Sequence, residues 1–204
     1  MPETMSMQST ALPPLLTTLD AALDATGAPF LELANTGITE MQIAATLEAA
    51  GLGPAPIELY EWFQWHNGSR EVPGRWGAEM VGPGFWTLFS LEDSLADRAR
   101  WMETWPPGSE MPWDPSWLPI AGGGQQNRLA ILLRTSTTDH AHVGFWAMGN
   151  GQDVDAMQTA ERSLADVVTT WLRALRERYV WWDETHQAWD MDGTATRPEF
   201  RLYS

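Results

Sequence analysis

Apolar positions at helical spacing predict three helices in the first third of the chain. The first begins at Pro13-Pro14 and ends near Gly27. The second opens with a capping box at Thr39 and Gln42 and ends before Gly51. The third begins at Pro56 and is expected to end at Asn67-Gly68, since glycine readily adopts the left-handed conformation that terminates helices. The second helix is expected to carry on its apolar side Met41, Ile43, Ala44 and Leu47.

Short apolar runs in the middle of the chain predict strands at 85–89, 117–121, 129–133 and 143–148. Gly122-Gly123-Gly124 separates two of these runs and is interpreted as a hairpin turn. Ser90 and Ser163, each with an aspartate three residues later, open two further helices, and the last helix keeps its apolar rhythm to Tyr179. Because the strands are joined by short connections, we expect an α+β fold whose sheet is mostly antiparallel and is packed against helices.

The rest of the chain is predicted to be loop or tail. Residues 69–84 and the stretch that begins at Pro106 are rich in glycine and proline, and residues 200–203 are a weak candidate for an edge strand. A chain of 204 residues is most simply one domain. We expect an N-terminal extension with one helix at 1–28, the main domain at 29–182, and a tail at 183–204 that packs on the domain or extends it.

The charge distribution is strongly one-sided. The formal net charge is −15, all 12 basic residues are arginine, and residues 1–69 contain eight carboxylates and no cation before Arg70. The negative electrostatic field of such a chain repels nucleic acid and anionic membranes and attracts cationic proteins. The simpler alternative is that the acidic surface only keeps the protein soluble. The chain has no cysteine, no secretory signal and no apolar run of about 20 residues, so a cytoplasmic protein with no nucleic-acid or membrane partner is predicted.

Motifs that would support catalysis are weak. His140 and His142 have the alternate spacing of metal ligands, but no third or fourth ligand is fixed near them. The Gly122–Gly124 run leads into a strand and the chain has no lysine, unlike phosphate-binding loops. Asp153/Asp155 and Asp190/Asp192 lack the glutamate that closes a calcium loop, and the second pair is interpreted as a turn. We therefore expect no catalytic residue, no metal and no organic cofactor.

Two aromatic segments, Leu59–Gly68 and Trp113–Ala121, are the most distinctive in the chain. They are preceded by Glu40, Ile43 and Glu48, separated by Phe85–Glu92 and followed by Ser163-Leu164. In this order the segments resemble the SUKH superfamily, the Smi/Knr-type family of cell-wall-assembly regulators and bacterial toxin-immunity proteins. The resemblance spans about residues 29–182, the size of one domain. It departs from the family pattern at Asn127–Leu133, where relatives often have an acidic residue and this chain has none.

The resemblance implies a non-enzymatic domain that binds another protein. Its bacterial relatives often neutralise a toxin, commonly a nuclease or deaminase, which here would be a basic protein. The oligomeric state stays open. Exposed tryptophans leave two alternatives open: a carbohydrate or cell-wall binding module, and a hydrolase whose site is not recognised.

The predicted partner-binding surface is the proline-rich loop around residues 101–114. Trp105 or Trp113 is expected to serve as the anchor, inside a rim of carboxylates that steers a basic partner. Roughly two-thirds of the 13 tryptophans, including Trp117, are expected in the core. The full predicted surface is Trp101, Glu103, Trp105, Glu110, Trp113 and Asp114.

Overall fold

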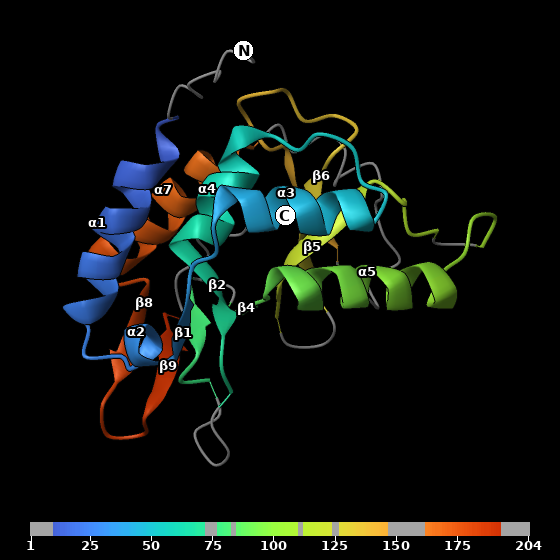
Figure 1. Ribbon diagram of the computed structural model, residues 1–204. Helices are drawn as coiled ribbons and strands as arrows, with labels where there is room; N and C mark the ends of the chain where they lie inside the picture. Colours follow the sequence, from blue (N-terminus) through green and yellow to red (C-terminus); the bar gives the residue numbers. More distant parts are fainter. Residues whose placement is uncertain are drawn as a thin grey trace, which may run out of the picture.

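The centre of the molecule is a five-stranded sheet, seen in a computed structural model that describes residues 10–71, 77–82, 85–109, 112–123, 127–146 and 162–192. Its strands follow one another in chain order, and every neighbouring pair is antiparallel (Figure 1). The predicted α+β fold is thus confirmed, with the four expected strands in one sheet. The strands are β3 (Met80–Val81), β4 (Trp86–Leu88), β5 (Trp117–Gly122), β6 (Arg128–Leu132) and β7 (Val143–Trp146).

The central hairpin β5–β6 separates two apolar clusters. Successive side chains of a strand point to opposite faces, so Leu129 and Ile131 enter the main core, whereas Ala130 and Leu132 enter a second cluster rich in tryptophan. All six residues of β5 are buried, so both faces of this strand are covered. The predicted turn after Gly122 is closed by the Gly123 N–H, which donates to the Asn127 carbonyl at 3.0 Å.

The long helices begin and end close to where the sequence predicts. The capping box at Thr39 is present, and Ser90 and Ser163 each accept from the backbone N–H three residues later. The first helix buries leucines at every third or fourth position and packs against the last helix. The helices are α1 (Leu12–Asp24), α2 (Phe30–Leu33), α3 (Glu40–Ala49), α4 (Ile57–Trp65), α5 (Leu91–Thr104) and α7 (Leu164–Arg176).

The expected end of the third helix is wrong. Helix α4 stops at Trp65, and β2 (His66–Ser69) pairs antiparallel with β1 (Ala34–Thr36). The side chain of Asn67 accepts the backbone N–H of Leu91 at 2.8 Å. Gly68 has φ 84°, and a Cβ there would lie 2.5 Å from the backbone nitrogen of Ser90. The Asn-Gly pair therefore holds a strand against the start of α5 instead of ending a helix.

Two regions that the sequence analysis predicts as loop or tail contain strands. The short strand β3 lies within residues 69–84, and β8 (Val180–Asp183) pairs with β9 (Ala188–Met191) in a separate hairpin. The predicted turn at Asp190 is wrong, since this residue lies in β9. The last helix ends at Arg176, before Tyr179, because Arg178 has φ 53° and leads the chain into β8. The predicted strand at 200–203 and the Asp153/Asp155 pair lie outside the described residues.

The N-terminal helix α1 and the C-terminal β8–β9 hairpin pack against the central region. Leu12, Leu16, Leu19 and Leu23 of α1 belong to the same core cluster as Trp171 of α7. Trp182 of β8 packs with Ala28 and Leu33, which flank and end α2. Both the expected N-terminal extension and the beginning of the expected tail therefore contact the region 29–182. In Figure 1 helix α1 lies beside α7, and the β8–β9 hairpin lies beside α2.

Candidate functional site

The tryptophans of the predicted partner-binding loop pack together against one face of the sheet. The ring centroids of Trp101 and Trp146 are 4.4 Å apart, and those of Trp113 and Trp117 are 5.3 Å apart. Ala130 of β6 lies in the same cluster and offers only a methyl group, which leaves room for the bulky rings. The cluster is a small second core between α5, the loop that follows it and the sheet.

This packing corrects part of the predicted surface. Trp101 is 5% exposed and Trp113 is 1% exposed, so neither ring is available as a surface anchor. The loop after α5 folds back, with the Trp113 N–H donating to the Trp105 carbonyl at 3.0 Å. Trp105 is only half-buried and keeps an accessible part. Glu110 lies outside the described residues. A role of this loop in binding a partner stays a prediction.

The two described carboxylates of the predicted rim differ in their availability. Glu103 is exposed on α5. Asp114 accepts the backbone N–H of Ser116 at 2.7 Å and lies 3.2 Å from the guanidinium of Arg134. Arg98 fastens the loop to α5 by donating to the Pro115 carbonyl at 2.9 and 2.6 Å, and burial lowers the pKa of its guanidinium. Glu103 is therefore the freer charge, and Asp114 mainly shapes the turn.

A buried ion pair lies under this loop. Nη2 of Arg128 donates to Oδ1 of Asp97 at 3.1 Å, and the Arg128 Nε donates to Oδ2. The indole N–H of Trp101 donates to the same carboxylate at 2.9 Å. The guanidinium carbon lies 5.5 Å from the ring centre of Phe89 and 5.2 Å from that of Trp101. Arg128, the first residue of β6, thus has its acidic partner on helix α5.

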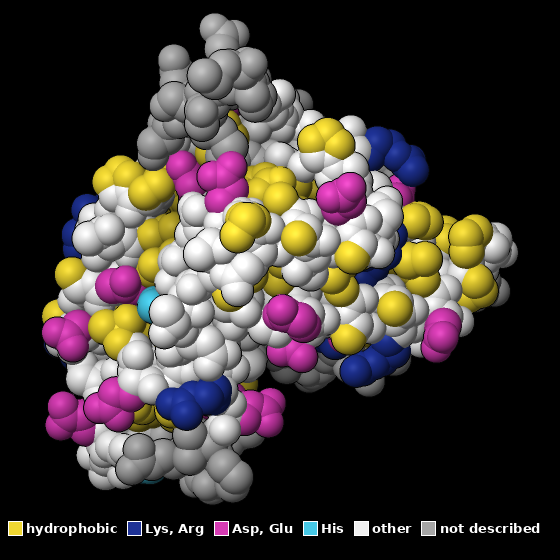
Figure 2. Space-filling view, in the orientation of Figure 1, with side chains coloured by type: hydrophobic (Ala, Val, Ile, Leu, Met, Phe, Trp, Pro, Cys, Tyr) yellow, Lys and Arg dark blue, Asp and Glu magenta, His cyan; other side chains and the backbone are white. Residues whose placement is uncertain are grey.

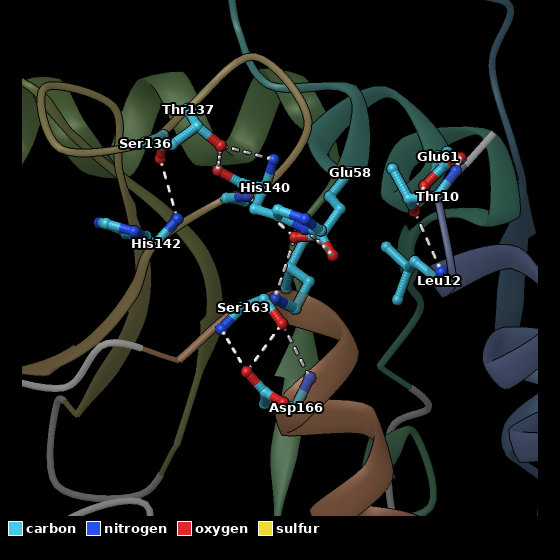
Figure 3. Close-up of polar contacts among 12 residues, drawn as sticks. Thr10, Leu12, Glu58, Glu61, Ser136, Thr137, His140, His142, Ser163 and Asp166 are labelled. Atoms are coloured by element: carbon cyan, nitrogen blue, oxygen red, sulfur yellow. Dashed lines mark hydrogen bonds and ion pairs between the residues drawn. The ribbon is translucent and has the colours of Figure 1, made fainter. Parts of the chain in front are cut away.

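A second buried carboxylate joins three segments that are far apart in the sequence (Figure 3). Glu58 of α4 is fully buried and accepts the backbone N–H of Ala141 at 2.8 Å and that of Leu164 at 3.3 Å. His140 Nδ1 lies 3.4 Å from the other carboxylate oxygen. Leu164 is the first residue of α7, where the helix dipole favours a negative charge. The sequence analysis missed Glu58, a lone acid in the first turn of an apolar helix.

The hydroxyl, imidazole and carboxyl groups near Glu58 serve structural hydrogen bonds. Ser163 Oγ donates to Asp166 and accepts its backbone N–H, as a helix cap does. His140 and His142 precede β7 and do not lie in it, so the alternate strand geometry expected for them is absent. In Figure 3 the His140 ring faces Glu58, whereas that of His142 points away from it. Among the described residues, no group of three or more possible ligands could hold a metal.

The structure defines an α+β domain built on one antiparallel sheet, with buried carboxylates that fasten helices to it. The model of the SMI1 / KNR4 family (SUKH-1) matches residues 37–174, and the chain belongs to this family. The match runs from the residue after β1 into the last turns of α7, so α1 and the β8–β9 hairpin lie outside it. Comparison with curated proteins gives no match. Over the part of the chain that the structure describes, no helix is long and apolar enough to cross a membrane.

Proposed function

We propose that this chain is a non-enzymatic protein-binding domain that acts as an immunity protein in the cytoplasm. Its partner would be a basic toxin of the nuclease or deaminase type, neutralised by direct binding over the cleft that holds nucleic acid. Family membership supports a protein partner of this kind. The observation that carries the proposal is the acidic N-terminal part, which has no cation before Arg70.

The described structure keeps much of this charge at the surface. Asp24, Glu32, Glu40 and Glu48 are all exposed, and they lie on or beside α1, α2 and α3. A cleft that binds phosphate must be positive, so it attracts a negative protein over a long range. Electrostatic steering can raise association rates to about 10⁸–10⁹ M⁻¹s⁻¹ at low salt. Fast capture would suit a protein that must bind its toxin before the toxin acts.

The burial of the tryptophans argues against the sugar-binding alternative. Of the 12 tryptophans in the described residues, eight are buried and four are half-buried, so none offers a fully open platform. The four half-buried residues are Trp65, Trp105, Trp181 and Trp189. Aromatic rings that stack on sugars need an open face, whereas half-buried rings inside a polar rim are typical of protein interfaces.

The test purifies the product of the open reading frame beside the gene, which we expect to contain a basic nuclease-like or deaminase-like domain, and measures its association with this chain. We expect tight binding, inhibition of that protein at equal stoichiometry, and an association rate that falls as salt rises while dissociation changes little. Glu103→Lys should slow association, and Glu184→Lys, an equal charge change on the β8–β9 turn, should slow it much less. Absence of inhibition, or an association rate independent of salt, would contradict the proposal.

A further inference from the structure

Helix α3 is apolar on two opposite sides, of which the core covers one. Ile43 and Leu47 are buried. Met41 is 78% exposed and is the one large hydrophobic side chain recorded as exposed among the described residues. Ala44 and Ala45 are exposed as well. The expectation that Met41 and Ala44 share the buried side with Ile43 is therefore wrong. We call Met41, Ala44 and Ala45 the outer face of α3.

Helix α3, which carries the outer face, lies beside α5 on one side of the molecule. Figure 1 shows the two helices running in the same direction, so that their C-terminal ends lie toward the same edge, and the helices contact each other. Figure 2 shows hydrophobic side chains distributed over α3 and α5, with carboxylates and arginines among and beside them. An apolar centre with a charged surround is the usual anatomy of a protein interface.

Both helix ends carry a carboxylate where helix electrostatics disfavour it. Glu48 lies in the last turn of α3 and Glu103 in the last turn of α5, and neither of these turns contains a basic residue. A negative charge at a helix C-terminus is repelled by the helix dipole. Helix α7 follows the favourable pattern, with Arg173 and Arg176 in its last turn. The placement of Glu48 and Glu103 weakens their helices, but it gives a strong local attraction for a cation.

We propose that the outer face of α3, together with the C-terminal ends of α3 and α5, is the docking surface for a basic protein. This inference rests on the proposed function and names the surface that performs it. Met41 and the two alanines contact the apolar centre of the partner. Arginine or lysine side chains of the partner bind Glu48 and Glu103, where carboxylate and helix dipole attract them together.

The charges around this surface favour a basic partner over a second copy of the chain. Two copies meeting through α3 would bring Glu40 and Glu48 of each close to the same acids of the other, in proteins that already carry −15. The cations of α5 are partly engaged within the chain. Arg98 is held by the Pro115 carbonyl, and Arg100 lies 3.8 Å from Asp97.

The experiment compares three variants in binding to the purified product of the open reading frame beside the gene, which the proposed function expects to be a basic toxin domain. Ala45→Arg places bulk and positive charge on the outer face, and Ala21→Arg makes the same change at an exposed position of α1. We expect Ala45→Arg to weaken binding by at least about tenfold, mainly through faster dissociation, and Ala21→Arg to leave it nearly unchanged. Circular dichroism checks that both variants are folded.

The third variant, Glu48→Lys, separates binding from a structural role. Because it removes a charge that the helix dipole repels, it should raise the thermal midpoint of the free protein while it slows association. Binding that is unaffected by Ala45→Arg and Glu48→Lys overturns this surface but leaves the proposed function intact. Absence of binding by the unsubstituted chain overturns both. A free protein that is a dimer, and that Ala45→Arg converts to a monomer, shows that a second copy occupies the surface.

Discussion

Arg128 and Asp97 form a bidentate ion pair across the interface between β6 and α5, with side chains only 11% and 8% exposed. The indole N–H of Trp101 donates to the same carboxylate. The pair therefore connects the sheet, the helix and the tryptophan cluster in one network. Ion pairs taken out of water are costly unless every charge keeps its partner.

Removing one member of this pair should destabilise the protein strongly. We expect Asp97→Ala to lower the free energy of unfolding by about 3–5 kcal/mol, because it leaves the Arg128 guanidinium buried without its partner. The double variant Asp97→Leu with Arg128→Met should cost clearly less, since no charge remains buried. Urea denaturation measures both. Arg134→Met, which breaks a pair with Asp114 whose arginine is 71% exposed, is the control and should cost less than about 1 kcal/mol. Equal losses for Asp97→Ala and Arg134→Met would contradict this account.

Glu58→Gln should loosen the junction of α4, the segment before β7, and α7. Both N–H groups bind the same carboxylate oxygen, so the uncharged amide oxygen of glutamine can still accept them but binds them more weakly. The amide NH₂ group then replaces the acceptor oxygen opposite Nδ1 of His140. We expect a loss of about 1–3 kcal/mol in the free energy of unfolding. Hydrogen exchange should become faster at the amides of Ala141 and Leu164, which donate to Glu58. Glu103→Gln, at an exposed position, is the control, and unchanged exchange at both amides would show that Glu58 does not hold this junction.

The two tryptophans proposed as anchors should behave differently on truncation. Trp113 is buried in the cluster, so Trp113→Ala should cost about 3–5 kcal/mol of stability. Trp105 is half-buried, and Trp105→Ala should cost much less. If the loop contacts the partner, Trp105→Ala should weaken binding by about 2 kcal/mol or more in a protein that remains folded. Calorimetry of the free protein and of the complex measures the two effects separately.

The β8–β9 hairpin carries at its surface a charged pair, formed by the last residue of β8 and a residue of the turn, whose titration can be followed directly. His186 Nδ1 lies 2.7 Å from Oδ2 of Asp183; this hydrogen bond raises the pKa of His186 and lowers the pKa of Asp183. The pair therefore stabilises the fold most between the ordinary pKa values of about 4 for aspartate and 6.5 for histidine. Its contribution is lost as pH rises through the folded pKa of His186, or falls through that of Asp183. NMR titration should show the raised pKa of His186 returning toward its ordinary value in Asp183→Asn.

Local chemistry was enough to predict much of the fold. The capping residues Thr39, Ser90 and Ser163 marked where α3, α5 and α7 begin, because each satisfies backbone donors that its helix leaves free. The central hairpin was predicted as well, since two apolar runs on either side of glycines can pair without a long connection. These features depend on residues that are close together in the sequence, so the sequence alone is enough to predict them.

The errors arose where a distant segment decides the conformation. Asn67-Gly68 forms part of β2 because β1 and the start of α5 supply its partners. Trp113 is buried because β6 places the small Ala130 opposite the folded-back loop. Met41 is a different kind of error: it lies two residues before Ile43, and positions two apart do not share a face of a helix, so its exposure follows from local spacing. The predicted binding surface required its tryptophan side chains to be exposed. Their exposure depends on how the folded chain packs, and it could not be inferred from the composition of the loop.

The pairing of α1 with α7 determines when the protein can become active during its synthesis. The leucines of the first helix are buried against a helix that begins only at Leu164. At about 5–20 residues per second, a ribosome needs roughly 7–30 s to make the chain from the end of α1 to α7. Throughout that interval α1 lacks its contacts with α7, although α2 and α4 can already pack against it, and the apolar surface that α7 covers must stay exposed or be held by a chaperone. A nascent chain without α7 therefore lacks the complete domain, so binding to any partner that recognises the folded protein should begin only after α7 has been made.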